Sequence, residues 1–325
     1  VQPDTKWRRP KMKKLLLGVA LSALMCSSAF AAKVGVSMAR FDDNFLTVLR
    51  NGMIAQAKGM DGVELQVEDA QNDVAKQLDQ INNFIASGVD AIIVNPVDTS
   101  ATQAMSDAAA KANVPLVYVN RQPINLATMP DNQAFVGSNE TDSGTVETKQ
   151  LCANWKAAGK TEVNVYAMEG QLSNQAAVQR TKDIHDVIGG PDCGVKVNII
   201  DEQTANWDRN QAQDLMTNWL STNKPFDGVI SNNDEMAIGA IQAMKAAGID
   251  MKSVVVGGVD ATQDALAAMQ AGDLDATVFQ DAAGQGAGAL DAALKLAKGE
   301  KVEHKVYVPF QLVTPANIDK FLKKN

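Results

Sequence analysis

The chain has 325 residues, enough for two ordinary α/β domains or one large domain. Apolar residues make up 46% and charged residues 21%, a composition that supports a buried core and excludes a disordered chain. The formal net charge of −8 makes nucleic acid an unfavourable partner, and three Cys with two His leave little material for a Cys/His zinc site.

The first segment of the chain has the three parts of a secretory signal peptide. Met12–Lys14 is a basic start, Leu15–Met25 is an apolar run, and Ala29–Ala31 has the small-x-small pattern that precedes a cleavage point. The run is too short to span a bilayer stably, which favours a cleaved leader over a membrane anchor. We therefore expect residues 1–31, an extension plus the signal peptide, to be removed. Six basic residues and one acidic residue leave with them, so the mature charge is −13.

Downstream of residue 31, short β-branched runs alternate with longer stretches of helical periodicity. The first half predicts strands at 34–38, 63–67, 91–94 and 116–119, with helices at 45–58, 74–87 and 99–112. The pattern then restarts, with strands at 163–168, 195–200, 228–230 and 254–256 and helices at 175–188, 209–220 and 236–247. Strands that alternate with helices indicate doubly wound parallel sheets. The predicted fold class is therefore α/β, with two similar units in tandem.

Two cysteines, Cys152 and Cys193, remain after removal of the leader. An oxidising compartment outside the inner membrane permits a disulfide between them. Two separate buried thiols are the alternative.

Polar and aromatic side chains collect where the predicted strands end, which is where doubly wound sheets bind ligands. They are carboxylates, amides, guanidiniums and aromatic rings. This mixture suits a neutral polyol, because the polar groups bond hydroxyls and the rings cover C–H faces. A helix N-cap is the alternative role for Asp42, Asp208 and Asp234, and core packing is the alternative for Trp207.

No catalytic motif accompanies these residues. The sequence has no GxSxG, HExxH or Walker A motif, and His185 and His304 lie apart from any nucleophile motif. Gly284–Ala289 has the glycine spacing of a dinucleotide fingerprint but lacks its acidic partner downstream, which favours helix packing. The prediction is a protein that is not an enzyme.

Six motifs occur in a fixed order along the chain: Phe41–Phe45, Asp69–Asp73, Val94–Asp98, Val119–Arg121, Asn233–Ala240 and Gly258–Ala261. Together they resemble the ribose/galactose group of periplasmic sugar-binding proteins that feed ABC importers. The resemblance covers nearly the whole mature chain and implies export to the periplasm.

The resemblance implies a type I periplasmic binding protein fold, with two lobes joined by a three-strand hinge. The crossovers would fall near Ser138-Asn139, Gln280-Asp281 and Pro309-Phe310. Residues 33–138 and 281–309 would form the N-terminal lobe, and residues 139–280 and 310–325 the C-terminal lobe.

In this family the solute lies in the cleft between the lobes. Carried over position by position, the resemblance implies ten ligand-binding residues: Asp43, Phe45, Asn120, Arg121, Asn174, Arg180, Trp207, Asn233, Asp260 and Gln280. Phe45 and Trp207 would sandwich the ring, and Arg180 would bind it through two parallel hydrogen bonds.

Departures from the family pattern narrow the solute. Ala39 and Asn174 stand where the glucose/galactose protein has a stacking aromatic and a His. Ala157–Thr161 replaces its calcium-binding loop, so we expect no metal and no cofactor. Asp43 and Gln171 differ from their counterparts in the ribose protein, which favours a more hydroxylated ligand than ribose.

Three further stretches are similar to inositol- and rhizopine-type binding proteins: Gly170–Ala176, Glu202–Trp207 and Phe310–Pro315. They imply myo-inositol or a methylated, aminated inositol as the ligand. An aldose such as galactose, glucose or ribose, with a chemoreceptor-signalling role, is the alternative.

The implied partners are this small molecule, an inner-membrane ABC permease and a chemoreceptor, and we expect a monomer. Sugar-responsive repressors share the fold but carry an N-terminal helix-turn-helix where this chain has the signal-peptide pattern. The mature charge of −13 also opposes DNA binding.

Overall fold

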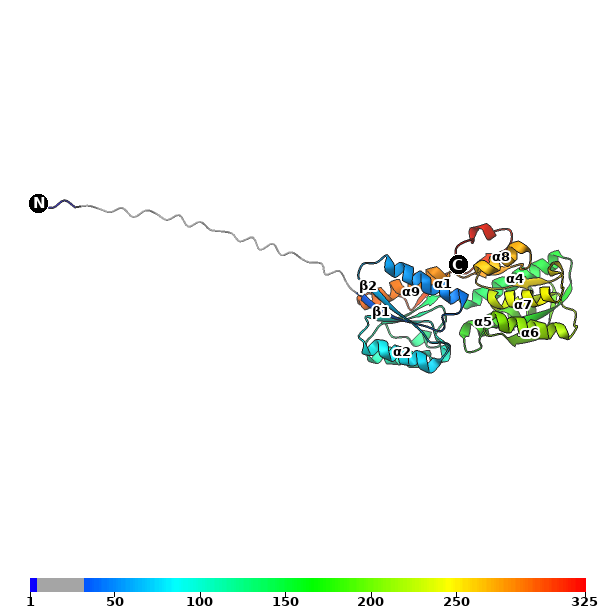
Figure 1. Ribbon diagram of the computed structural model, residues 1–325, viewed down its shortest axis with the longest axis horizontal. Coiled ribbons are helices and arrows are strands. Elements are labelled where there is room, and N and C mark those ends of the chain that lie inside the picture. Colours follow the sequence, from blue (N-terminus) through cyan, green and yellow to red (C-terminus); the bar gives the residue numbers. More distant parts are fainter. Residues whose placement is uncertain (5–31) are drawn as a thin grey trace. The chain divides into compact units, whose positions relative to one another are not determined.

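The computed structural model describes residues 1–4 and 32–325, so the predicted signal peptide lies outside the described residues. Residues 32–325 contain two parallel sheets, each covered by helices on both faces (Figure 1). This arrangement confirms the predicted α/β class with two lobes. Among the helices of the described residues, none combines the length and hydrophobicity needed to cross a membrane.

The first lobe is built on a six-stranded, wholly parallel sheet. Its strands, in spatial order, are β11 (Lys305–Tyr307), β5 (Gln133–Gly137), β4 (Leu116–Val119), β3 (Ala91–Val94), β1 (Ala32–Met38) and β2 (Val63–Asp69). One face is covered by α1 (Asn44–Lys58) and α9 (Ala282–Ala297). The other face is covered by α2 (Val74–Ala86) and α3 (Thr102–Lys111).

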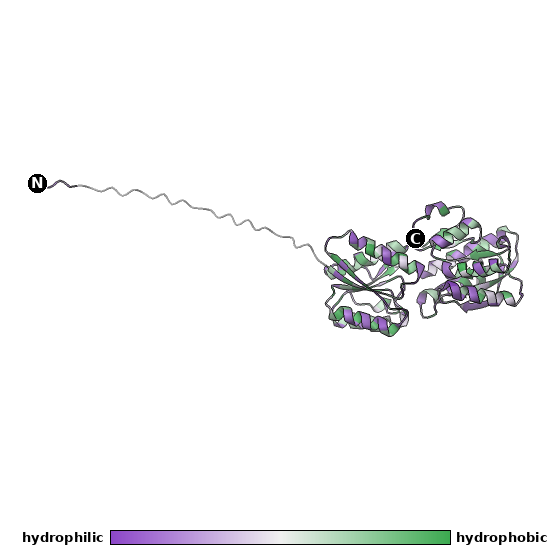
Figure 2. Cartoon of the chain, viewed as in Figure 1, coloured by the Kyte–Doolittle hydropathy of each residue, from purple (hydrophilic) through white to green (hydrophobic). Residues whose placement is uncertain are grey.

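The strand β3 explains why the sequence shows a continuous apolar run here. Ile93 faces the core under α1 and α9, whereas Ile92 and Val94 face the core under α2 and α3. A parallel strand buried on both faces needs apolar side chains at every position. The covering helices are instead amphipathic, and Figure 2 shows hydrophobic and hydrophilic residues alternating along α2.

The second lobe has a four-stranded parallel sheet in the order β7 (Lys196–Thr204), β6 (Glu162–Glu169), β8 (Gly228–Ser231) and β9 (Val255–Gly257). An antiparallel pair, β10 (Thr277–Phe279) with β12 (Gln311–Val313), is attached through single bridges to the β9 segment. The helices α4 (Glu140–Ala157) and α5 (Gln175–Gly189) cover one face. The other face carries α6 (Arg209–Ser221), α7 (Asp234–Ala246) and α8 (Gln263–Ala271).

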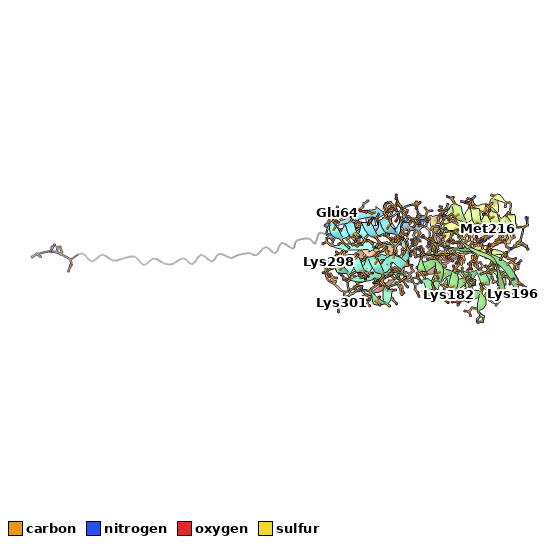
Figure 3. All side chains as sticks on the ribbon, turned by 90° about the horizontal axis from the view of Figure 1, so that it is seen from below. Glu64, Lys182, Lys196, Met216, Lys298 and Lys301 are labelled. Atoms are coloured by element: carbon orange, nitrogen blue, oxygen red, sulfur yellow. A yellow bond between two sulfur atoms is a disulfide. The ribbon has the colours of Figure 1, made fainter. Side chains whose placement is uncertain are left out.

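Short 3₁₀ turns complete the chain at η1 (Thr99–Ala101), η2 (Leu126–Thr128), η3 (Met251–Ser253) and η4 (Ile318–Lys320). Exposed charged side chains lie on both lobes, as Figure 3 shows for Glu64 and Lys301 on the first lobe and for Lys182 and Lys196 on the second. Charged side chains thus lie largely at the surface. The buried charged side chains described below are exceptions to this rule.

The chain passes between the lobes three times. It leaves the first sheet after β5, returns after β10 into α9, and leaves again between β11 and β12. All three crossovers come within a few residues of the carboxyl ends of strands. They therefore lie beside the edge at which the strand-end loops gather.

Cys152, in α4, is joined by a disulfide to Cys193, which precedes β7. Both residues are buried in the core between α4, α5 and the second sheet. The bond links α4, the helix that follows the first crossover, to the segment that leads into β7.

Removing the disulfide is expected to lower the free energy of unfolding by about 4 kcal/mol, because the bond closes a long loop in the unfolded chain. The variant is Cys152→Ala with Cys193→Ala, and urea unfolding under non-reducing conditions measures the loss. Reducing the wild-type protein should reproduce it. A loss below about 1 kcal/mol in both cases would show that the bond constrains the unfolded chain little.

Candidate ligand-binding site

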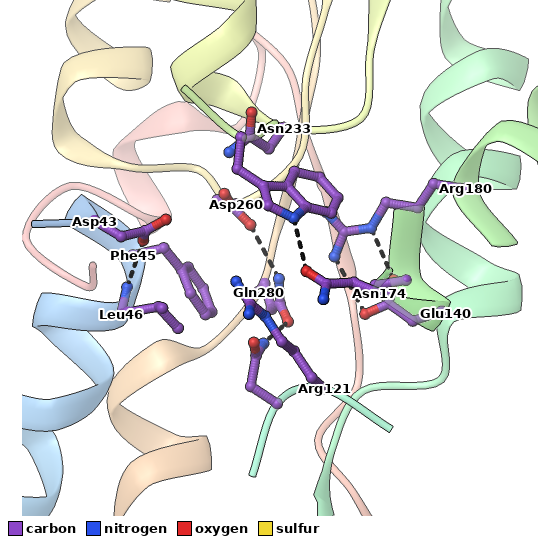
Figure 4. A pocket seen from close by; sticks show the side chains of 13 residues that line it. Asp43, Phe45, Leu46, Arg121, Glu140, Asn174, Arg180, Asn233, Asp260 and Gln280 are labelled. Atoms are coloured by element: carbon purple, nitrogen blue, oxygen red, sulfur yellow. Dashed lines mark hydrogen bonds and ion pairs between the residues drawn. The ribbon is translucent and has the colours of Figure 1, made fainter. Parts of the chain in front are cut away.

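One pocket is lined by residues of both lobes, mostly from loops that follow strand ends (Figure 4). Its lining residues are Asp43, Phe45, Leu46, Asn120, Arg121, Glu140, Asn174, Ala176, Arg180, Trp207, Asn233, Asp260 and Gln280. All ten residues singled out from the sequence are thus brought together. Leu46, Glu140 and Ala176 are additions that the sequence did not indicate.

Asp43 both caps α1 and lines the pocket. Its Oδ1 accepts a hydrogen bond from the backbone N–H of Leu46 at 2.8 Å, and its Oδ2 pairs with Nη2 of Arg40 at 3.2 Å. The N-cap is thus Asp43, and the alternative prediction of a cap at Asp42 is wrong, because the helix begins one residue later. Phe45 follows in the first helical turn, where it is buried against the first-lobe core.

Asp260 and Gln280 form a hydrogen-bonded pair at the centre of the pocket. Nε2 of Gln280 donates to Oδ1 of Asp260 at 2.9 Å, and Oε1 of Gln280 accepts from Nδ2 of Asn120 at 2.9 Å. Gln285 also donates to Oε1 of Gln280 at 3.1 Å, so this oxygen accepts two hydrogen bonds. Within the described residues, no hydrogen bond reaches Oδ2 of Asp260, although the residue is only 3% exposed. This oxygen is therefore available to a ligand.

Arg180 and Glu140 form a buried ion pair at the second-lobe wall. Nε and Nη2 of Arg180 donate to the two carboxylate oxygens of Glu140 at 2.8 and 3.2 Å, and Nη1 donates to the backbone carbonyl of Asn232 at 2.7 Å. Burial lowers the pKa of Arg180, but the charge of Glu140 and its hydrogen bonds outweigh burial, so the net shift is upward. Glu140 thus occupies the Nε–Nη2 edge of Arg180, and the expected pair of hydrogen bonds from Arg180 to the ligand stays a prediction for its remaining N–H groups.

Arg121 carries the pocket's other guanidinium and is buried from solvent. Its Nη1 donates to the carbonyl of Pro96 at 2.8 Å, and in residues 32–325 no carboxylate lies within ion-pair distance of it. Burial lowers the pKa of Arg121 to about 10, with the charge of Asp43 opposing the shift. Its remaining N–H groups are donors in a dry setting, where hydrogen bonds from a charged group are strong.

Trp207 packs in the core and also lines the pocket, so its position is consistent with both roles that the sequence left open. It packs in the second-lobe core, against Gly170, where an added Cβ would come within 2.1 Å of the indole. It also lines the pocket, and its Nε1 donates to Oδ1 of Asn174 at 2.9 Å. The amide nitrogen Nδ2 of Asn174 donates to the carbonyl of Val97 at 2.9 Å. Asn174 thus orients the ring and also contacts the first lobe.

Of the two N-cap residues predicted for second-lobe helices, one is confirmed and the other is wrong. Asp208 caps α6, accepting from the backbone N–H of Gln211 at 2.9 Å, as its alternative role predicts. Asp234 does not cap α7. Asn233 is the cap, accepting from Met236 at 3.0 Å, while Asp234 is the first helical residue and is buried.

The two lobes are closed over the pocket in this structure. On one rim, Thr99 donates to the carbonyl of Ser173 through its backbone N–H and its hydroxyl, each at 3.0 Å. On the other rim, Asn44 donates to Glu235 at 2.8 Å and Arg40 to the carbonyl of Trp207 at 3.4 Å. A closed pocket excludes water, which strengthens every polar contact inside it.

Buried carboxylates in the pocket lining and behind it have raised pKa values. Burial raises the pKa of Glu147 to about 8 and that of Asp234 to about 7, and it also raises the pKa of Asp260 well above its ordinary value. The charge of Arg180 opposes the shift at Asp260, while the charges of Asp234 and Asp43 add to it. Oε2 of Glu147 has no hydrogen-bond partner, which makes its charged form costly.

These shifts predict a stability that falls as the pH rises. Between the ordinary and the raised pKa values, the folded chain binds more protons than the unfolded chain, so folding is favoured at lower pH. The melting temperature of the ligand-free protein should therefore fall between pH 5 and pH 8. Glu147→Gln should flatten this slope and add on the order of 2–4 kcal/mol at pH 8. A variant with the wild-type slope would contradict the assignment to Glu147.

Two lobes of parallel sheet, joined by three crossovers around a dry polar pocket, define a two-lobed solute-binding protein. Residues 34–301 match the model of the periplasmic binding protein domain, and the chain belongs to this family. Members of the family bind solutes and are not enzymes, which confirms the prediction of a protein without catalytic activity.

Similar proteins extend over almost the whole chain. A Rhizobium meliloti protein named "Putative rhizopine-binding protein" is 62% identical over 314 residues, which cover 97% of this chain and 100% of the relative. A solved solute-binding protein of an ABC transporter from Bacillus halodurans, with bound myo-inositol, is 38% identical with a TM-score of 0.84, covering 92% of this chain and 100% of that one. The Caulobacter myo-inositol binding protein, bound to myo-inositol, is 29% identical with a TM-score of 0.79, covering 89% and 95%.

Proposed function

We propose that this chain is the periplasmic component of an ABC importer and that it captures a cyclic polyol, myo-inositol or a related inositol. The observation that carries the proposal is the pocket itself. It offers an unoccupied acceptor on Asp260 and unoccupied donors on Arg121, beside the rings of Phe45 and Trp207. Such a pocket suits a molecule with polar edges and two apolar faces.

The ten residues divide into three roles. Phe45 and Trp207 cover the C–H faces of the ring. The charged groups of Asp43, Asp260, Arg121 and Arg180 bond its hydroxyls, Arg180 through the N–H groups that Glu140 leaves free. The amides complete the hydrogen bonding and hold the charged groups in place: Asn120, Asn174, Asn233 and Gln280.

Transport follows from lobe closure. We assign residues 33–138 and 281–309 to one lobe and residues 139–280 and 310–325 to the other, with the three crossovers as the hinge. The membership of β11 in the first sheet and of β12 with β10 supports this division. Solute contacts from both lobes can be completed only in the closed form, so the solute stabilises it. The closed form is then presented to an inner-membrane permease, after export directed by the signal peptide.

The relatives support an inositol. Two similar solved proteins hold myo-inositol, one from Bacillus halodurans and one from Caulobacter. An inositol has a hydroxyl on every ring carbon, which matches a pocket lined by more polar and charged side chains than apolar ones.

An aminated, methylated inositol is a second candidate ligand, favoured by the charge of the pocket. Asp43 is paired with Arg40 and Glu140 with Arg180, whereas Oδ2 of Asp260 accepts no hydrogen bond from the described residues. An ammonium on the ligand would donate to this oxygen. The Rhizobium meliloti relative is named for rhizopine, a ligand of this kind.

A thermal-shift screen of the mature protein, starting at Ala32, tests the proposal. The panel holds myo-inositol, scyllo-inositol, an amino-inositol, glucose, galactose, ribose and xylose. A saturated tight site stabilises the folded state by about 3–4 kcal/mol, which raises the melting temperature by several degrees. Shifts with inositols alone support the proposal. Shifts with aldoses alone overturn the solute and favour an aldose-binding protein with a signalling role.

A further inference from the structure

We propose that Asn325 is a positioning residue of the pocket, which fixes the backbone that carries Asp260 and Gln280. All the hydrogen-bonding groups of its side-chain amide are used on this backbone. Nδ2 of Asn325 donates to the carbonyls of Asp260 and Gln280, each at 2.6 Å. Its Oδ1 accepts from the backbone N–H of Ala282 at 3.2 Å. The inference rests on the proposed function, because it names a residue on which that site depends.

The backbone at Asp260 needs such support. Asp260 has φ of 125° and Ala261 has φ of 52°, both in the region that favours glycine. A side chain in this region is strained, and the conformation persists only where several contacts hold it. The N–H of Asp260 is held by Val278 at 2.8 Å, and its carbonyl accepts from Gln280 at 3.3 Å. The 2.6 Å bond from Asn325 is the shorter of the two bonds to that carbonyl.

The same three bonds join the strained loop to a crossover. Gln280 follows β10 in the second lobe, whereas Ala282 begins α9 in the first lobe. The side chain of Gln280 also donates to Oδ1 of Asp260. A tilt of either backbone segment would therefore misplace the carboxylate and the amide together.

Asn325 is itself held by the second lobe. Phe321 is buried, and its ring lies 5.2 Å from the ring of Phe279 in β10. The backbone N–H of Lys323 donates to Oε1 of Gln263 in α8 at 3.2 Å. Asn325 is thus presented to the loop by a segment that is docked on the second lobe.

The test compares Asn325→Ala with a matched variant, Asn317→Ala. Asn317 lies in the same segment, and its side-chain amide also bonds the backbone through both of its polar atoms. Its Oδ1 accepts from the backbone N–H of Thr314 at 2.8 Å, and its Nδ2 donates to the carbonyl of Leu312 at 3.0 Å. None of its partners lines the pocket. Isothermal titration with myo-inositol should show affinity about tenfold weaker for Asn325→Ala and unchanged for Asn317→Ala. Asn325→Asp, which keeps the acceptor and loses the donors, should be at least as weak.

Two further measurements separate positioning from a general loss of stability. In the ligand-free protein, hydrogen exchange at residues 260–262 and 280–282 should be faster in Asn325→Ala and unchanged in Asn317→Ala. In an Asp260→Ala background, Asn325→Ala should weaken binding by less than the tenfold expected in the wild-type background, because one of the two groups that it positions is gone. Wild-type exchange, wild-type affinity or full additivity would each overturn the inference. If the wild-type protein binds nothing in the panel, the proposed function fails, and hydrogen exchange alone decides whether Asn325 holds this loop.

Discussion

Asp260→Ala is expected to weaken the binding of myo-inositol by at least about a hundredfold. The carboxylate is buried, its Oδ1 is held by Gln280, and its Oδ2 faces the ligand space with no bond from the described chain. Truncating a buried charged acceptor loses the bond and leaves its partners unpaired, which costs about 2–5 kcal/mol. Isothermal titration at neutral pH measures the loss.

The same variant should not be less stable in urea, because burial already raises the pKa of this carboxyl and its charge opposes folding at neutral pH. Asp208→Ala is the matched control, since Asp208 follows a strand in the same lobe but caps α6 outside the pocket lining. It should cost about 1 kcal/mol of stability and leave the affinity unchanged. An Asp260→Ala protein with wild-type affinity would remove Asp260 from the site.

Glu140→Ala is expected to cost about 3–5 kcal/mol of unfolding free energy, since it leaves the guanidinium of Arg180 buried without its partner. The affinity for myo-inositol should also fall, at least about tenfold, because Arg180 loses the two bonds that fix its plane against the pocket. Urea unfolding and titration of one preparation give both values. Glu140→Gln, which keeps the shape and one acceptor, should lie between the wild type and the alanine variant.

The control for this pair is Glu162→Ala, which breaks an ion pair at the surface. Lys196 and Glu162 pair at 2.7 Å, with side chains 67% and 53% exposed, against 4% and 2% for Arg180 and Glu140. Exposed pairs contribute little to stability, so the urea midpoint should not move. Equal effects of Glu140→Ala and Glu162→Ala would show that burial does not set the importance of the Arg180 pair.

The parts of the fold that were predictable from sequence are those with strong apolar patterns. The strands β3 and β4 have the predicted bounds, because both are four-residue runs buried on each face. The helix α4 has no such pattern, since its buried face includes Ser143, Glu147 and Thr148. The strands β10, β11 and β12 have three residues each, too few for a period to appear.

The site was predictable as far as strand ends define it. Glu140 was missed because it follows a crossover and begins a helix without a visible period. The one available signal was its position directly after the predicted crossover at Ser138-Asn139, which lies beside the edge where the strand-end loops gather. The caps were misplaced at Asp42 and Asp234 because neighbouring polar residues, Asp43 and Asn233, are equally good caps, and only the path of the backbone selects between them.

A crystal structure of the mature protein with myo-inositol tests the central claim most directly. The proposed function predicts one inositol between the two lobes, with its ring between Phe45 and Trp207 and a hydroxyl within hydrogen-bond distance of Oδ2 of Asp260. Arg121 should donate to a second hydroxyl, while the pair between Arg180 and Glu140 stays intact. A pocket that stays empty at saturating inositol, or an inositol bound elsewhere, would contradict it.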